Sequence, residues 1–280
     1  MQSRRRWPRI VGALLVTCVI AAAAFAVPRL GDEPPPPAND RQPARHDTVA
    51  IFGATGRVGE GILTAALNDA GVQRVHVITR RTSPAIDRGV SLGIVSATTH
   101  TDYLNYGAIR HVLAEVDHVY WALGTSTLNV DSAEYAQIHV EFPRALVKEW
   151  IEVRGAEAAL TFHYISGSGA SAESWVRWAR EKERAERELT EMVRGTNVRV
   201  VSYRPGGVVA VPGDVLTFRQ KLSRTLFVPT KLSIDATSIG EAMLEVTARG
   251  DGANGRVLEN RELLSLAIGY RRAAQPRAGG

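Results

Sequence analysis

Cysteine is nearly absent from this chain of 280 residues: Cys18 is the only one, and it lies in an apolar run near the N-terminus. The rest of the chain therefore has no internal disulfide, no thiolate metal site and no cysteine nucleophile. With 25 glycines and 13 prolines the chain is not collagen-like, and its 45% share of hydrophobic residues excludes a disordered chain. The composition indicates an ordinary globular protein.

Outside the N-terminus the chain has almost no net charge. Of the 34 basic and 29 acidic residues, seven and three lie in residues 1–46, which leaves 27 and 26 in residues 47–280. The formal net charge of +5 therefore describes mainly the N-terminal segment. The body of the chain carries no basic footprint for nucleic acid.

Several catalytic motifs are missing from the sequence. The seven histidines show no metal-ligand spacing and no H-E-x-x-H pattern occurs, so we expect no metal site. A G-x-S-x-G turn and a phosphate-loop lysine are absent as well, which argues against a hydrolase and a phosphotransferase.

One long hydrophobic run is present near the N-terminus. Residues 10–27 carry no charge and follow Arg4, Arg5, Arg6 and Arg9. This length is the lower limit for spanning a bilayer and slightly exceeds a usual signal-peptide core. We expect residues 1–28 to form a hydrophobic helix that is either a membrane anchor or a cleaved signal. The arginines before the run predict that the body lies on the non-cytoplasmic side, membrane-associated through this helix or exported after cleavage.

Proline concentrates in the next segment. Residues 29–46 contain four consecutive prolines among polar residues, which favours an extended spacer without a core. We expect a linker here, followed by a folded domain over residues 47–275. That length is enough for one α/β domain with a substantial core.

The domain alternates predicted strands with predicted helices. Strands are expected at residues 48–52, 75–79, 90–96, 118–123, 159–166 and 198–204, and helices at residues 57–69, 106–114, 132–153, 173–193, 238–249 and 261–271. Such apolar strands belong in a parallel sheet covered on both faces. The expected fold is α/β, a doubly wound, Rossmann-like parallel sheet. After Arg204 the pattern becomes loop-rich, which predicts a small irregular C-terminal lid over the substrate.

The most informative stretch is the turn after the first predicted strand, Gly-Ala-Thr-Gly-Arg-Val-Gly at residues 53–59. Gly53 permits the tight turn, Gly56 lets the backbone approach a pyrophosphate, and Gly59 lets the helix pack close to the strand. The N-terminus of the following helix faces the anion. The turn predicts a dinucleotide site, with a glycine-rich turn that binds no ligand as the alternative.

Arg80 and Arg81 end the second predicted strand, where an NAD-preferring site places a carboxylate against the ribose 2′-hydroxyl. Guanidinium groups suit a 2′-phosphate instead. Arg57, inside the glycine turn, is also placed to reach that phosphate. These residues favour NADP over NAD, with a solvated pair of loop charges as the alternative.

Three further motifs follow along the chain. They are Ala-Leu-Gly-Thr at 122–125, Ile-Ser-Gly-Ser-Gly-Ala at 165–170 and Tyr-Arg-Pro-Gly at 203–206. With the glycine turn and the arginine pair, they resemble the atypical short-chain dehydrogenase/reductases over about residues 48–247. The sequence is similar in particular to the oxidoreductase branch that includes the viral Tat-interacting protein and, more distantly, to the NmrA-like proteins.

The resemblance implies a nicotinamide dinucleotide and gives individual residues their roles. Asp102 would lie near the adenine, Leu123 and Gly124 along the ribose and phosphates, and residues 205–208 near the nicotinamide. The expected cofactor-binding residues are Gly53, Thr55, Gly56, Arg57, Val58, Gly59, Arg80, Arg81, Asp102, Leu123, Gly124, Lys182, Pro205, Gly206 and Val208.

The same resemblance implies a catalytic group. In this family a serine orients the substrate carbonyl, a tyrosine donates the proton, and a lysine four residues later holds the nicotinamide ribose and lowers the tyrosine pKa. Ser166 and Lys182 match the serine and the lysine, but Trp178 stands at the tyrosine position. An indole has no hydroxyl to ionise, so it cannot perform that acid–base step.

Three interpretations of Trp178 stay open. The protein is a reductase whose proton comes from elsewhere, for example from Tyr164 or water; or it is a non-catalytic NADP-binding sensor or scaffold; or Trp175 and Trp178 are core residues in a different register. We expect an NADP-binding oxidoreductase acting on a carbonyl or related small molecule, with the sensor or scaffold as the alternative.

Overall fold

The computed structural model describes residues 48–127, 129–155, 159–209, 233–250 and 252–274. The predicted N-terminal hydrophobic helix and the linker lie outside the described residues, and so do residues 210–232 of the expected lid. Within the described part of the chain, no helix is both long and apolar enough to cross a membrane.

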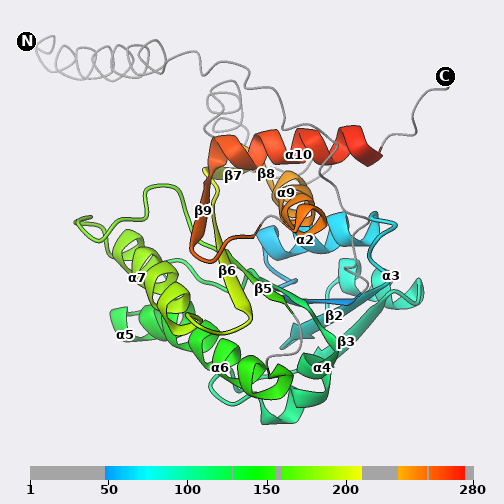
Figure 1. Cartoon of the computed structure of the whole chain (residues 1–280), viewed down its shortest axis with the longest axis horizontal. Helices are drawn as coiled ribbons and strands as arrows, with labels where there is room; N and C mark the ends of the chain where they lie inside the picture. The colour runs from blue at the N-terminus through cyan, green and yellow to red at the C-terminus, as the bar shows by residue number, and fades with distance from the viewer. Residues whose placement is uncertain (1–47, 128, 156–158, 210–232, 251, 275–280) are drawn as a thin grey trace, which may run out of the picture. The chain divides into compact units, whose positions relative to one another are not determined.

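A seven-stranded sheet forms the centre of the domain (Figure 1). Its strands are β1 (Thr48–Phe52), β2 (Arg74–Thr79), β3 (Val95–Thr99), β4 (His118–Trp121), β5 (Leu160–Ile165), β6 (Val198–Arg204) and β9 (Arg256–Glu259). They lie in the order β3-β2-β1-β4-β5-β6-β9, and every neighbouring pair is parallel. From β1 the chain adds β2 and β3 on one side and then β4, β5 and β6 on the other, so the strand order switches between β1 and β4. Open α/β sheets bind ligands at such switch points. The predicted Rossmann-like α/β fold is confirmed.

Helices cover both faces of the sheet, as Figure 1 shows. On one face lie α2 (Arg57–Leu67), α3 (Pro84–Ser91), α9 (Ala236–Arg249) and α10 (Asn260–Ala274), and on the other lie α4 (Arg110–Glu115), α6 (Phe142–Arg154) and α7 (Arg177–Met192). Successive residues of a strand point to opposite faces, so Val49 and Ile51 enter the first core while Ala50 and Phe52 enter the second. Apolar side chains therefore fill both faces of the sheet, and the polar groups of the candidate site lie at the strand ends.

The strand expected at residues 90–96 is wrong. Helix α3 occupies the first part of that range, and β3 begins only at Val95. The start of α3 has a clear physical cause, because the Ser83 hydroxyl accepts a hydrogen bond from the Ile86 N–H and Pro84 stands at the first helical position. The apolar run at the end of this helix was mistaken for a strand.

The long helix expected at residues 132–153 is interrupted in the structure. After α5 (Ser132–Ala136) the chain passes through a π-helical turn, η3 (Gln137–Glu141), before α6 begins. Such turns insert one residue and re-aim the side chains around them. Here His139, in the middle of the turn, is only 3% exposed.

The described C-terminal residues pack into the domain. Helix α9 packs against α2, α10 packs against α9, and β9 adds a strand to the sheet. Two short strands, β7 (Gly207–Val209) and β8 (Ser233–Asp235), pair in parallel. Residues 233–250 and 252–274 therefore belong largely to the layers of the domain, and the loop-rich stretch expected to form the lid falls mainly on residues outside the described ranges.

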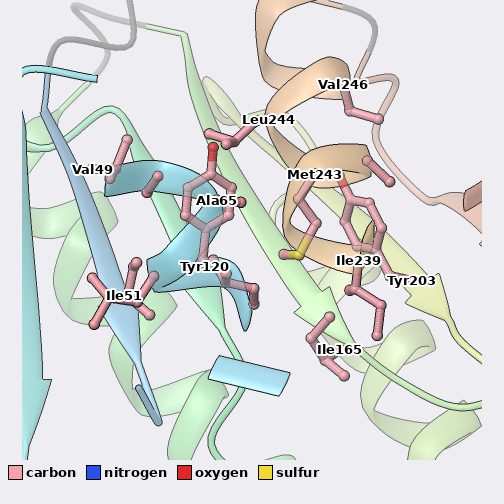
Figure 2. Close-up of a cluster of buried hydrophobic side chains, with 14 of the residues drawn as sticks. Val49, Ile51, Ala65, Tyr120, Ile165, Tyr203, Ile239, Met243, Leu244 and Val246 are labelled. Atoms are coloured by element: carbon pink, nitrogen blue, oxygen red, sulfur yellow. The ribbon is translucent and has the colours of Figure 1, made fainter. Parts of the chain in front are cut away.

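Helices α2 and α9 approach each other backbone to backbone. A Cβ atom at Gly61 would collide with Ala236, and one at Gly240 would lie 2.8 Å from the Ala65 Cβ. Figure 2 shows Ala65 and Met243 in the hydrophobic cluster beside this contact. The two glycines allow the helix that follows the glycine turn to be fixed by the C-terminal part of the chain.

Candidate functional site

The turn between β1 and α2 is closely packed. Gly53 has a φ of +81°, and a Cβ atom there would lie 2.6 Å from the Leu123 backbone N. The Gly56 N–H donates to the Gly53 carbonyl at 2.9 Å, and a Cβ at Gly59 would collide with that same carbonyl. Each of the three glycines thus serves the tight turn that the sequence predicted.

A pocket opens beside this turn at the carboxyl ends of β1, β2 and β4. The space inside it is about 550 Å³, part of which is continuous with solvent. Its lining residues are Gly53, Thr55, Gly56, Ile78, Thr79, Arg80, Arg81, Tyr103, Ala122, Leu123 and Gly124. Seven of the expected cofactor-binding residues are among them, and no acidic residue is.

The arginine pair is held in place by the end of β2. The Thr79 hydroxyl donates to the Arg81 carbonyl at 2.6 Å and accepts from the Arg81 N–H at 3.2 Å. The backbone of the turn is thereby fixed, while both arginine side chains remain exposed at the pocket wall.

Other expected cofactor-binding residues lie around the pocket without lining it. Arg57 reaches across to donate to the Val208 carbonyl at 3.4 Å, and Val58 and Gly59 lie in the first turn of α2. Asp102 accepts a hydrogen bond from the Leu104 N–H at 3.2 Å and precedes the pocket residue Tyr103.

The residues expected near the nicotinamide meet the end of β5. The Pro205 carbonyl accepts a hydrogen bond from the Ser168 N–H at 2.9 Å. The Gly206 N–H donates to Asn260 Oδ1 at 2.7 Å. These bonds place the loop after β6 beside the loop that carries Ser166.

Ser166, Trp178 and Lys182 come together at this end of the sheet. The Ser166 Oγ atom is buried and has no hydrogen-bond partner among the described residues. Trp178 lies over the next residue, since a Cβ atom at Gly167 would be 3.3 Å from its ring. One turn later along α7, Lys182 Nζ donates to the Ile165 carbonyl at 2.7 Å. The spacing of Trp178 and Lys182 therefore places both side chains on the face of α7 that covers Ser166.

Burial changes the charge state of Lys182. Its pKa is lowered to about 7, mainly because the ammonium group loses hydration, while Glu186 opposes the shift. Glu186 also accepts hydrogen bonds from Arg204, at 2.9 and 2.6 Å. Lys182 Nζ also lies 4.8 Å from the centre of the Tyr164 ring.

His139 is a member of this site that the sequence reasoning missed. Its Nε2 atom lies 3.2 Å from the Thr125 N and 3.1 Å from the Thr125 O, and a Cβ atom at Gly124 would be 2.7 Å from its ring. Burial, with a smaller contribution from Lys182, lowers the pKa of His139 to about 2. The neutral imidazole therefore supports the loop that lines the pocket, and its Nδ1 atom has no partner in the described residues. No spacing in the sequence marks such a role.

Two side chains named in the interpretations of Trp178 do not take the suggested roles in the structure. Tyr164 is fully buried, its hydroxyl donates to the His139 carbonyl at 3.0 Å, and burial raises its pKa well above 10. It is therefore not a free proton donor. Trp175 is 91% exposed, so it is not a core residue. Within the described ranges, no cluster of three or more His, Cys, Asp or Glu side chains is arranged to hold a metal ion.

The sheet order and the glycine turn define a nucleotide-binding fold of the Rossmann type. No family model matches the chain, and no curated protein matches it. Among the solved structures that share this fold are short-chain dehydrogenases/reductases.

Three of these structures illustrate the match. A short-chain type dehydrogenase/reductase from Mycobacterium ulcerans superposes with a TM-score of 0.60 and 16% identity over 79% of this chain and 91% of the other. Actinorhodin polyketide ketoreductase with NADPH gives a TM-score of 0.57 and 16% identity over 76% and 95%. UDP-glucuronic acid 4-epimerase from Bacillus cereus in complex with NAD gives 0.56 and 16% over 76% and 77%. At these identities the similarity establishes the fold.

Proposed function

We propose that the chain is an NADP-binding oxidoreductase of the atypical short-chain type that acts on a carbonyl or a related small substrate. The observation that carries the proposal is the pocket at the switch point, which joins the glycine turn to Arg80 and Arg81 and contains no carboxylate. Solved structures of this fold hold NAD or NADPH. Two guanidinium groups favour the cofactor with the 2′-phosphate.

The residues at both ends of the site fit a nicotinamide dinucleotide. No side chain caps the N-terminus of α2, so its first N–H groups are available to a pyrophosphate. Gly56 has an extended backbone and leaves room for close approach. At the other end of the site, Ser166 Oγ is buried and has no partner in the described residues. Because buried hydroxyls normally have a partner, this one is available to a substrate carbonyl.

The chain's own residues then divide the work of a carbonyl reduction. Bound in its reduced form, the dinucleotide supplies a hydride to the carbonyl carbon. Ser166 Oγ donates a hydrogen bond to the carbonyl oxygen and orients it. Trp178 covers the neighbouring loop but supplies no proton. Lys182 Nζ, whose pKa is about 7, provides the proton to the oxygen and regains it from water.

The second candidate function is a non-catalytic NADP-binding sensor or scaffold. Trp178 supports it, because an indole takes the place of the acid and the nearby Tyr164 hydroxyl is already bonded to a backbone carbonyl. In this case the pocket binds the dinucleotide and the end of β5 contacts no reacting group.

Calorimetric titration of the full chain with NADPH, NADP, NADH and NAD tests the proposal. We expect NADPH and NADP, which carry the 2′-phosphate, to bind at least tenfold more tightly than NADH and NAD. A charge-assisted hydrogen bond contributes about 1.5–3 kcal/mol. Equal affinity for all four would leave a dinucleotide-binding protein without the proposed preference. Binding of none would overturn both candidate functions.

We also propose that residues 10–27 attach the domain to a membrane or direct its export, with the domain on the non-cytoplasmic side. The proposal rests on the apolar run and the arginines before it. Mass measurement of the mature chain separates an anchor from a cleaved signal, and protease treatment of intact cells or spheroplasts tests the side. A domain protected from protease in intact spheroplasts would contradict the proposed topology.

A further inference from the structure

The pocket wall opposite the glycine turn contains a tyrosine whose hydroxyl is unused. Tyr103 is 4% exposed and lines the pocket. Its ring stacks on Phe142, with centroids 5.5 Å apart, and meets His100 edge to face at 5.4 Å. These contacts fix the ring, yet the hydroxyl makes no hydrogen bond to any residue that the structure describes.

Two other buried tyrosines use their hydroxyls within the fold. The Tyr106 hydroxyl donates to the Phe142 carbonyl at 3.1 Å, and the Tyr164 hydroxyl donates to the His139 carbonyl at 3.0 Å. The Tyr103 hydroxyl is not among the enclosed polar atoms that lack a partner, so it remains accessible from the pocket that the residue lines. A ligand in the pocket can therefore accept a hydrogen bond from it.

The surroundings of Tyr103 specify the charge of such a ligand. Burial raises the pKa of the Tyr103 phenol, and the positive Arg80 opposes part of this rise, so the guanidinium acts on the phenol directly. Arg80 and Arg81 line the same pocket, and no acidic side chain does. The Thr79 hydroxyl is occupied by the Arg81 backbone. The polar side chains free at this wall are therefore donors, and an anion satisfies them.

We propose that Tyr103 is a specificity residue that donates its phenolic hydrogen bond to the 2′-phosphate of NADP, together with Arg80 and Arg81. This inference rests on the proposed function. It adds a neutral donor, held rigidly by Phe142 and His100, to two flexible charged ones. A rigid donor selects position as well as charge, so it distinguishes a 2′-phosphate from an anion placed elsewhere on the ribose.

The test is calorimetric titration of the full chain with 2′,5′-ADP and with 5′-AMP, which lacks the 2′-phosphate. Tyr103→Phe keeps the ring and removes only the hydroxyl. We expect it to weaken binding of 2′,5′-ADP about tenfold and to leave binding of 5′-AMP within about twofold. Tyr106→Phe is the matched control, because it removes a neighbouring hydroxyl outside the pocket lining and should leave both affinities unchanged.

The other outcomes have definite meanings. Equal weakening of both nucleotides, or no change in either, would overturn the role of Tyr103 at the 2′-phosphate. If Tyr103→Phe alters the melting temperature strongly, Arg80→Gln, a change at an exposed side chain, gives the same comparison and must also weaken 2′,5′-ADP selectively. A wild-type chain that binds NADPH and NADH equally would refute the proposed NADP preference itself. A clear preference for NADPH that Tyr103→Phe leaves unchanged would refute this inference alone.

Discussion

The two ends of the site differ in how their polar groups are supported. At the cofactor end, the turns are fixed by local backbone bonds, and Arg80 and Arg81 extend into solvent. At the end of β5, Ser166 Oγ and His139 Nδ1 are buried without partners in the described residues, and Lys182 is buried as a base of unusually low pKa. The exposed arginines lower the stability of the folded chain little, whereas the buried polar groups at the end of β5 lower it.

For the proposed function, this difference implies that cofactor binding and chemistry are separable. A glycine turn binds through its backbone, so it needs space more than special side chains. A reaction centre needs buried polar groups in defined protonation states, which lower stability unless a ligand satisfies them. Substitutions at one end should therefore leave the other end intact, and the following predictions test that separation.

Trp178→Tyr should have the largest effect. It restores a phenol one helical turn from Lys182, and a positioned general acid contributes about 10²–10⁴-fold to rate. We expect a gain of that order in NADPH-dependent reduction across a panel of aldehydes and ketones, with NADPH affinity unchanged. Trp175→Tyr is the control, because Trp175 is 91% exposed and should give no gain. A variant that binds NADPH yet reduces no carbonyl would favour the non-catalytic function.

Two glycine substitutions should separate folding from binding at the cofactor end. Gly59→Ala places a Cβ against the Gly53 carbonyl and should lower the free energy of unfolding by about 3 kcal/mol. Gly56→Ala meets that carbonyl only at 3.3 Å and should change stability by less than about 1 kcal/mol. It should nevertheless weaken dinucleotide binding at least about tenfold, because its methyl group occupies the space of the pyrophosphate. Similar stability losses in both variants would contradict this account of the turn.

Lys182→Met should stabilise the protein. The pKa of Lys182 falls from its ordinary 10.5 to about 7 on folding, so the unfolded chain holds its proton more tightly and the buried amine opposes folding below pH 10.5. The shift in pKa corresponds to about 4 kcal/mol at pH 7, and the lost hydrogen bond to the Ile165 carbonyl offsets about 1.5 kcal/mol of it. We therefore expect a net gain of about 2–3 kcal/mol in denaturant unfolding, which shrinks as the pH approaches 10.5. Lys148→Met, at an exposed position of α6, should change stability little at any pH. A pH-independent gain would point to packing and not to charge.

The smallest predicted effect concerns His139. Its pKa is about 2 in the folded chain and near 6.5 in the unfolded chain, so stability is complete above pH 6.5 and is lost as the pH falls below it. This residue should contribute a loss of about 1.4 kcal/mol between pH 7.5 and 5.5. His139→Gln should remove that part of the decline, while His111→Gln, at an exposed position, should not. An unchanged pH dependence in His139→Gln would show that the imidazole titrates normally.

Local sequence patterns predicted most of the fold. The bounds of β1 and β6 were predicted correctly because both are short β-branched runs ended by glycine or arginine-proline turns. Helix α3 was missed although Ser83-Pro84 marks its start, since the apolar residues near its end outweighed the capping residues. Strand β9 has a single buried residue and depends on its pairing with β6, which no local pattern shows.

The site was predictable where function rests on the backbone. The glycine turn and the arginine pair lie in one pocket as expected. His139 and Tyr103 were not expected there, because their roles depend on the π-helical turn and on stacking with Phe142, which are products of tertiary packing. Tyr164 was expected to be a possible proton donor. It lies on β5, just before Ser166, but its hydroxyl donates a hydrogen bond to the His139 carbonyl, which no sequence pattern indicates.

The backbone contact between α2 and α9 limits how the chain can be divided. A nucleotide-binding module trimmed after β6 would retain every residue of the glycine turn, yet it would expose the groove at Gly61 that Ala236 fills. Any minimal or circularly rearranged version of this domain must therefore keep Ala236–Arg249 in place against the first helix. Helix α9, near the end of the chain, thus holds in place the helix that follows the glycine turn.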